Sequence, residues 1–262
     1  MQLKVLYTFS EPDFGAGYEM LVKKFPEVNF IKQSSSFKRD VLEIISGANK
    51  YVGLFTDDDI MFGDFDVGLD ELDEMFKAVE PISLSLRLGR NTIIQDPYRD
   101  ILVRMPRFDN HGRFLIWDSK NVGNFVIEIR ENITYKNYYD CNFGMPVSLD
   151  GHIYKKQLLA PILENISFYC PNSMEMSMSV AKASAFRSSM LSSFVESIVV
   201  NSPNNKVQDL VKTTFAGEKF ALELEELNHQ FLEGKVLDLN KVYGFDIKGC
   251  HQELNLEMIW QN

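Results

Sequence analysis

Three consecutive aspartates, Asp57, Asp58 and Asp59, are the residues whose type and spacing point most directly to chemistry. They follow the apolar run YVGLFT, which has the composition of a buried strand. Like charges packed at a strand end repel one another, so a positive group should offset them. Carboxylate oxygens are the preferred ligands of hard divalent cations, and the run therefore predicts a metal site. A solvated acidic turn is the alternative interpretation of the same residues.

The directions of these three side chains depend on whether the strand continues through them. Successive side chains of a strand point to opposite faces, so we expect Asp57 and Asp59 on one side. Asp58 would then face elsewhere or bond to backbone amides. The run also ends a strand, and open α/β sheets bind ligands at the edge where their strands end.

Strands and helices alternate in the part of the chain that must position these carboxylates. The predicted strands are residues 3–9, 28–32, 51–56 and 82–88. The predicted helices are residues 19–24, a segment capped by Ser35 or Ser36 that stops near Gly47, and residues 68–79. Residues 10–17 are expected to form a loop. The alternation predicts an α/β fold with a mixed, mostly parallel central sheet flanked by helices.

The rest of the chain predicts further elements without a linker or an internal repeat. Residues 143–163 predict a loop, a short strand and a helix, and residues 170–186 begin as a loop and become helical. Further strands are predicted at 114–117, 124–129 and 197–201, and helices within 203–213 and 223–235. We therefore expect one domain over residues 1–262, with halves of about 1–118 and about 119–262.

The net charge excludes some classes of partner. The chain has 27 basic and 37 acidic residues, for a formal net charge of −10. Nonspecific nucleic-acid binding needs a positive footprint, which this chain lacks overall. An anionic substrate would instead need a metal ion, a helix N-terminus or a few basic residues at the site.

The cysteines and the N-terminal residues predict a cytoplasmic protein. Cys141, Cys170 and Cys250 are odd in number and lack CxxC spacing, which is typical of reduced thiols rather than of disulfides or a zinc site. The N-terminal residues lack the pattern of a signal peptide. No segment approaches the ~20 apolar residues that span a bilayer, so no transmembrane segment is expected.

Several segments together resemble the GT-A glycosyltransferases. A strand that ends in DDD after an alternating α/β part is similar to the nucleotide-diphospho-sugar transferase fold of these enzymes. The segments that carry the resemblance are FK, LFTDDDI, SLSLRLG, VSLDGHIY, PNSMEM, NSPNNKVQD, NHQFLEGKVLD and CHQE. The resemblance implies transfer of a sugar from a nucleoside-diphosphate sugar, UDP- or GDP-linked, to a glycan or other hydroxyl acceptor, with Mn²⁺ or Mg²⁺.

The resemblance also implies a ligand set for the cation. Asp59 is the first-choice ligand, because the last aspartate of such a motif binds the metal directly. Asp57 is expected to contact the ribose or a metal-bound water, beside Asp58. His251 fits the late third contact, and an imidazole among carboxylates suits manganese. An ordinary surface histidine is the alternative for His251.

Further residues are implied as contacts of the nucleotide sugar. Three residues that end the first strand are expected to meet the base and ribose: Tyr7, Thr8 and Ser10. Three basic residues are expected near the diphosphate or the sugar: Lys38, Arg87 and Lys248. Core packing remains the alternative for the tyrosine, and a solvated side chain remains the alternative for the lysine at position 38.

Two later carboxylates are candidates for the chemistry at the sugar carbon. Transfer passes through an oxocarbenium-like transition state, and an inverting enzyme also needs a carboxylate that takes the acceptor's proton. Asp150 lies at a turn and Glu175 beside a predicted helix start, so either is a candidate base while the other holds the donor sugar. A turn aspartate and a helix N-terminal charge are the alternatives.

Other functions fit the sequence less well. A sugar nucleotidyltransferase would have a glycine-rich basic loop after its first strand, whereas SEPDFGAG is acidic and lacks arginine. A phosphatase with an aspartyl nucleophile would have its aspartates directly after that strand, where Phe9 to Glu11 stand. A noncatalytic carbohydrate-binding protein remains a second alternative. No calcium-loop pattern occurs in the sequence.

Overall fold

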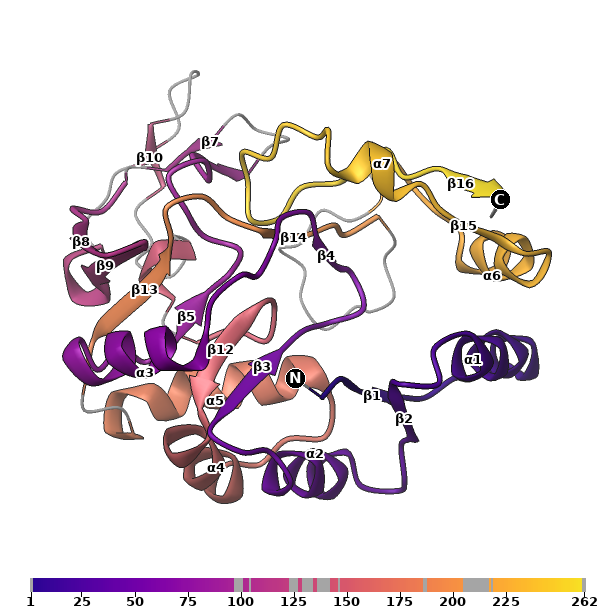
Figure 1. Cartoon of the computed structure of the whole chain (residues 1–262), viewed down its shortest axis with the longest axis horizontal. Coiled ribbons are helices and arrows are strands. Elements are labelled where there is room, and N and C mark those ends of the chain that lie inside the picture. The colour runs from indigo at the N-terminus through magenta and orange to yellow at the C-terminus, as the bar shows by residue number, and fades with distance from the viewer. Residues whose placement is uncertain are drawn as a thin grey trace.

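The protein folds around a six-stranded sheet that both halves of the chain build together (Figure 1). The structure is a computed structural model, and it describes residues 2–96, 101–103, 105–122, 127–128, 134–135, 142–145, 147–185, 188–204, 217 and 219–260. The sheet has the order β3 (Tyr51–Leu54), β12 (His152–Lys155), β5 (Leu84–Ser85), β13 (Met190–Phe194), β9 (Phe114–Asp118) and β8 (Asp109–His111). The fold is therefore mixed α/β.

The expectation of a mostly parallel sheet is wrong. Among the described strands of this sheet, β5 and β13 run parallel, and the other neighbouring pairs run antiparallel. The alternation did indicate that β3 and β5 have the same direction, since each is antiparallel to β12. It gave no sign that a strand from much later in the chain lies between them.

The N-terminal segment forms a small sheet of its own. Strands β1 (Lys4–Tyr7) and β2 (Asn29–Lys32) pair in parallel, as the alternation predicts. The expected loop at residues 10–17 is wrong, because helix α1 (Pro12–Lys24) already begins at Pro12. Proline suits the first position of a helix, where its missing N–H costs nothing.

Helices cover the two faces of the central sheet. Helix α2 (Phe37–Ser46) is capped by the Ser36 hydroxyl, which accepts from the Arg39 amide, so the predicted serine cap is confirmed. Helix α3 (Leu69–Ala78) packs with β5 in one core cluster, whereas α2, α4 (Lys156–Asn165) and α5 (Pro171–Ala185) contribute to another. The core therefore lies on both sides of the sheet.

The remaining elements surround this centre. The short strands are β4 (Asp59–Met61), β6 (Ile94–Asp96), β7 (Ile101–Leu102), β10 (Ile127–Glu128), β11 (Thr134–Tyr135), β14 (Val199–Asn201), β15 (Lys235–Leu237) and β16 (Met258–Trp260). The remaining helices are η1 (Ser119–Asn121), η2 (Asn142–Gly144), α6 (Leu224–Leu232) and α7 (Leu239–Val242). The helix predicted within residues 203–213 lies mostly outside the described residues.

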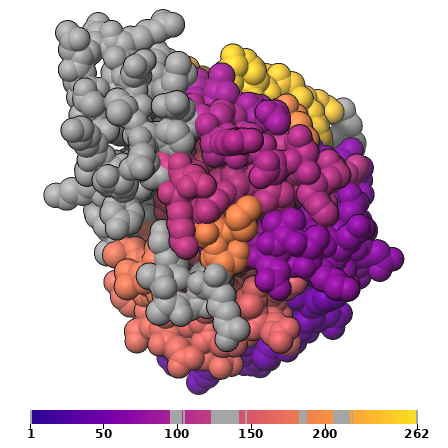
Figure 2. Space-filling model, turned by 90° about the vertical axis from the view of Figure 1, so that its left-hand side faces the viewer, coloured from indigo at the N-terminus to yellow at the C-terminus, as the bar shows by residue number. Residues whose placement is uncertain are grey.

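The two predicted halves lie against each other on the face seen in Figure 2, where early, middle and late parts of the chain adjoin. Within the described residues, no helix has the length and apolar character needed to cross a membrane.

Candidate functional site

The register of β12 brings distant segments together at one edge of the sheet. His152 at the start of β12 pairs with Leu54 at the end of β3 and with Ser85 at the end of β5. Consequently the residues after β3, the residues after β5 and those before β12 meet at this edge. We call the side chains gathered there the Arg87 cluster: Thr56, Asp58, Asp59, Arg87, Ser148, Asp150, Glu175, Asn201 and His251.

The aspartate run forms a turn rather than continuing the strand. The Asp59 amide donates to the Thr56 carbonyl (3.3 Å), and the Asp59 carboxylate accepts from the Thr56 amide (2.9 Å). Asp58 accepts from the Thr56 hydroxyl (2.7 Å), whereas Asp57 is exposed. The expected alternation, with Asp57 and Asp59 on one side, is therefore wrong: Asp58 and Asp59 face the cluster together.

Arg87 lies at the centre of the cluster and is 3% exposed. Its Nη1 contacts Asp150 Oδ2 at 2.9 Å and His251 Nε2 at 2.8 Å. Its Nη2 donates to the Ser148 hydroxyl at 3.0 Å. The guanidinium is always protonated, so it supplies a buried positive charge to surrounding acids.

Ser148 connects Arg87 to Glu175 of α5. The Ser148 hydroxyl donates to Glu175 Oε1 at 2.6 Å, and the same oxygen accepts from the Leu149 amide at 3.1 Å. The Asp150 amide in turn donates to the Ser148 hydroxyl (3.2 Å). One short loop before β12 thus fixes both carboxylates that the sequence singles out for catalysis.

Asn201 joins the aspartate turn to the C-terminal segment. It pairs with Asp59 across strands β14 and β4, and it forms a parallel bridge with His251. Its side-chain amide nitrogen donates to Asp59 Oδ1 (3.3 Å), and its oxygen contacts His251 Nδ1 (3.1 Å).

These contacts determine the tautomer of His251. Arginine has only donors, so His251 Nε2 must accept from Arg87 and carries no hydrogen. The hydrogen therefore sits on Nδ1 and is donated to Asn201 Oδ1. The pKa of His251 falls to about 4, because burial and the nearby Arg87 charge both disfavour the imidazolium. The ring is thus neutral at physiological pH.

The carboxylates of the cluster are crowded. Burial raises the pKa of Asp59 to about 8, and the charge of Asp150 adds to this. The pKa values of Asp58 and Glu175 are also raised, first by burial and further by Asp150. One arginine therefore does not fully offset the negative charge.

The donor atoms of this cluster are of the types that a divalent cation binds. Carboxylate oxygens and a neutral imidazole nitrogen are suitable ligands, and added positive charge would relieve the crowding. Within the part of the chain that the structure describes, no three His, Cys, Asp or Glu side chains are arranged to hold a metal ion. Hydrogen bonds occupy the atoms that would ligate the ion in this structure. Asn201 bonds both Asp59 and His251, and Arg87 bonds both His251 and Asp150.

Two of the predicted basic residues have other partners. Lys38 donates to the carbonyls of Glu164 (2.9 Å) and Ile166 (2.6 Å) at the end of α4. Lys248 forms an ion pair with Asp246 at 2.6 Å. Of the three basic residues that the sequence suggests, the structure brings Arg87 into the cluster.

The end of β1 offers an aromatic surface near the aspartate turn. Thr8 and Ser10 are exposed, and Tyr7 stacks on Tyr18 of α1 with ring centroids 4.2 Å apart. The pKa of Tyr18 is raised by burial and then by the charge of Asp57. The charge of Asp57 thus acts on the aromatic pair at the end of β1.

Sequence reasoning missed several members of the site. Thr56 and Ser148 were overlooked although each stands within two residues of a selected aspartate. The sequence indicates the segment from Asn201 to Gln208 as part of the acceptor side, and it did not indicate that Asn201 joins Asp59 to His251. The stacking of Tyr18 on Tyr7 needs the packing of α1 against β1, and we find no signal for it in the sequence.

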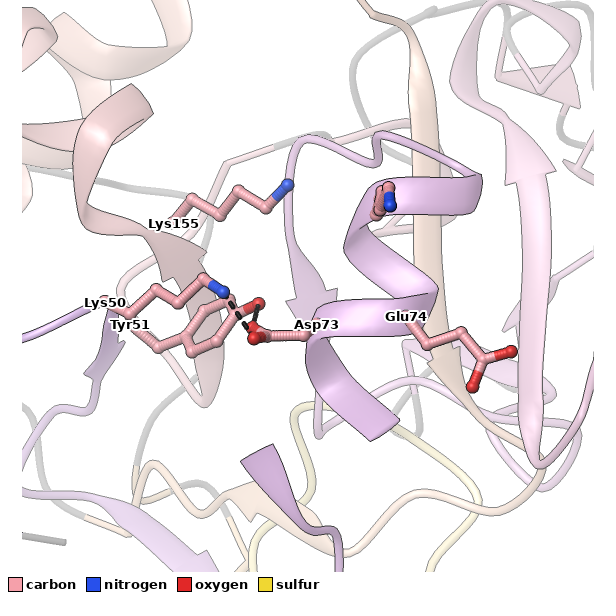
Figure 3. A pocket seen from close by; sticks show the side chains of 6 residues that line it. Lys50, Tyr51, Asp73, Glu74 and Lys155 are labelled. Atoms are coloured by element: carbon pink, nitrogen blue, oxygen red, sulfur yellow. Dashed lines mark hydrogen bonds and ion pairs between the residues drawn. The ribbon is translucent and has the colours of Figure 1, made fainter. Parts of the chain in front are cut away.

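A pocket of about 530 Å³ lies at the other end of β3 and β12 (Figure 3). It is lined by Lys50, Tyr51, Asp73, Glu74, Lys77 and Lys155. Asp73 pairs with Lys50 and accepts from the Tyr51 hydroxyl at 2.6 Å, and Lys155 donates to the Phe76 carbonyl at the end of α3. Lys50 and Lys155 thus have partners, and the pocket is separate from the Arg87 cluster.

Comparison with known proteins gives one informative similarity. The chain is similar to the bifunctional glycosyltransferase pgtA of Dictyostelium discoideum, with 28% identity over 153 residues. The match covers 53% of this chain and 19% of that protein, so the chain spans about a fifth of the relative's length. No known protein family and no solved structure matches the chain.

Proposed function

We propose that the chain is a metal-dependent glycosyltransferase of the GT-A type. It would transfer a sugar from a nucleoside-diphosphate sugar, UDP- or GDP-linked, to a glycan or other hydroxyl acceptor. The observation that carries the proposal is the Arg87 cluster, where buried carboxylates, one arginine and a neutral histidine meet at a sheet edge. The distant similarity to pgtA supports the same class of reaction.

The residues that would hold Mn²⁺ or Mg²⁺ directly are Asp59 and His251, whereas Asp57, which is exposed at the turn, would contact the ribose or a metal-bound water. Bound there, the cation would stabilise the charge that develops on the leaving diphosphate. Arg87 is the buried donor available to the diphosphate or the sugar. Tyr7, stacked on Tyr18, would give the base an aromatic surface, with Thr8 and Ser10 beside it.

Asp150 and Glu175 would divide the work at the sugar. Asp150 is held by Arg87, and Glu175 by Ser148 and the Leu149 amide, so both carboxylates are fixed in direction. One would accept the proton of the attacking hydroxyl while the other holds the donor sugar.

Calorimetry with a nucleoside diphosphate and Mn²⁺ tests the binding part. Asp59→Ala should abolish metal-dependent binding, whereas Asp70→Ala on α3, away from the cluster, should leave it intact. Unchanged affinity in Asp59→Ala would refute the metal assignment. Transfer assays test the chemistry: Asp150→Asn and Glu175→Gln should retain donor binding, and at least one should lose turnover by about 10²-fold or more.

The same assays separate the alternatives. A sugar nucleotidyltransferase would release pyrophosphate from a nucleoside triphosphate and a sugar phosphate. A noncatalytic carbohydrate-binding protein would bind glycans and consume no donor. The segment SEPDFGAG after β1 is acidic and lacks arginine. It argues against the nucleotidyltransferase, because that enzyme needs basic groups there to meet a triphosphate.

A further inference from the structure

Two acceptors, one of them the prospective metal ligand His251, converge on one nitrogen of Arg87. Nη1 lies 2.8 Å from His251 Nε2 and 2.9 Å from Asp150 Oδ2. An imidazole nitrogen and a carboxylate oxygen that meet at one positive centre form the kind of donor pair that a divalent cation uses. In this structure the positive centre is a guanidinium.

The lone pair of His251 can serve only one partner. A neutral imidazole has a single unprotonated nitrogen, and here that nitrogen is Nε2, which accepts from Arg87. A metal ion binds histidine through the same lone pair. His251 therefore cannot ligate a cation while Arg87 keeps this hydrogen bond.

Arg87 is incompletely satisfied where it lies. The side chain is 3% exposed, and its Nε has no hydrogen-bond partner among the described residues. Buried donors without partners cost free energy, and native proteins satisfy most of them. Its position therefore leaves one donor, Nε, unsatisfied.

We propose that Arg87 is a displaceable internal cation of this site. It gives up its contact with His251 Nε2 when the site takes a divalent cation, and the freed Nη1 hydrogen then donates to the diphosphate of the donor while Asp150 Oδ2 keeps its bond to Arg87. The proposal rests on the proposed metal-dependent function. It makes cation binding the step that frees this hydrogen of the arginine.

The test measures Mn²⁺ affinity by the electron paramagnetic resonance signal of free Mn²⁺, without nucleotide or acceptor. The full-length chain is compared as wild type, Arg87→Gln, His251→Ala and the double variant. Removing the competing donor should tighten Mn²⁺ binding about tenfold in Arg87→Gln, the size expected for one charged hydrogen bond. In the His251→Ala background the same substitution should have little effect.

The double variant distinguishes displacement from simple charge repulsion. An equal gain in the His251→Ala background would mean that Arg87 only repels the ion through space, and this would overturn the proposal. Unchanged or weaker binding in Arg87→Gln would also overturn it. If no variant or wild type binds Mn²⁺, both the exchange and the metal-dependent function are wrong.

A second measurement leaves the buried arginine in place. In wild type labelled with ¹⁵N-histidine, His251 should show an unprotonated Nε2 and a protonated Nδ1 before metal is added. Addition of Cd²⁺ should shift the Nε2 resonance by direct ligation while Nδ1 stays protonated. Cd²⁺ binding that leaves the His251 signals unchanged would overturn the exchange and leave the proposed function standing.

Discussion

Asn201 shows how one neutral side chain links two parts of the site. It accepts from His251 Nδ1 and donates to Asp59, so it fixes the ring's tautomer and the direction of a carboxylate together. Residues that orient metal ligands in this way contribute about 10–100-fold to metal affinity. In the proposed metal site, Asn201 is therefore a positioning residue.

Replacing Asn201 by leucine keeps its size and removes both hydrogen bonds. We expect Mn²⁺ affinity to fall by roughly 10–100-fold, because His251 and Asp59 lose their fixed directions. Titration of free Mn²⁺ measures the change, and Asn165→Leu on α4 is the matched control. A ¹⁵N spectrum should also show that His251 no longer keeps a single tautomer; full affinity in Asn201→Leu would contradict this role.

The start of α2 shows how a local motif determines the stability of an element. Asp40 accepts from the Ser34 amide and hydroxyl, both at 2.6 Å, and ties the β2–α2 connection to the helix. These bonds, first that of the Ser34 hydroxyl, lower the pKa of Asp40 below 3.8. A carboxylate held in this way stabilises the fold only while it is ionised.

The sign of the pH effect follows from that lowered pKa. Asp40 contributes its full stabilisation above the unfolded value of 3.8, and the contribution is lost as the pH falls through the lower folded value. Asp40→Asn should therefore destabilise the protein at pH 7, with a difference that shrinks below pH 3.8. Urea denaturation across this range measures it. Ser34→Ala should lose part of the same pH-dependent difference, and a constant difference at all pH values would contradict the assignment.

The chain segment that leaves β5 passes very close to the turn after β13. A Cβ added at Gly89 would lie 2.4 Å from the Ser197 amide nitrogen and 2.7 Å from the Glu196 carbonyl carbon. Backbone atoms cannot move aside cheaply, so Gly89→Ala should lower the free energy of unfolding by about 1–3 kcal/mol. Urea denaturation tests this against Gly244→Ala, whose added Cβ meets only a carbonyl oxygen at 3.5 Å. Equal stability of the two variants would contradict the close approach.

For individual helices and strands, the local sequence patterns predicted the local structure well. The Ser36 cap, the helix at residues 69–78 and the strand followed by a helix after Gly151 are confirmed, because each depends on neighbouring residues alone. Strand β13 was missed, since its sequence MLSSF places two buried serines where apolar residues are expected. The order of strands depends on pairing between distant segments, which local patterns do not contain.

The same reason limits prediction of the site. Asp59, Arg87, Asp150, Glu175 and His251 were each selected by motif, and the structure gathers them in one cluster. The partners that connect them were not selected, because a serine or an asparagine gains its importance only from strand register.

The charge of the whole molecule opposes its proposed donor. With a formal net charge of −10, the protein repels a free nucleoside diphosphate at long range. Raising the ionic strength from about 10 mM to about 150 mM shortens the screening length from about 30 Å to about 8 Å, so association of the nucleoside diphosphate with the Mn²⁺-loaded protein should become faster. Stopped-flow binding measures the rate, and an uncharged nucleoside serves as control. A rate that falls with salt would mean that the local field of Arg87 and Mn²⁺ dominates.

The position of β12 also bears on how the chain can be divided. A fragment that ended near residue 118 would keep β3 and β5 but lose the strand that joins them, leaving unpaired backbone amides and carbonyls along both. Exposed strand edges of this kind promote aggregation. The N-terminal half is thus no independent module, and any exchange of this half between proteins must carry residues 152–155 with it.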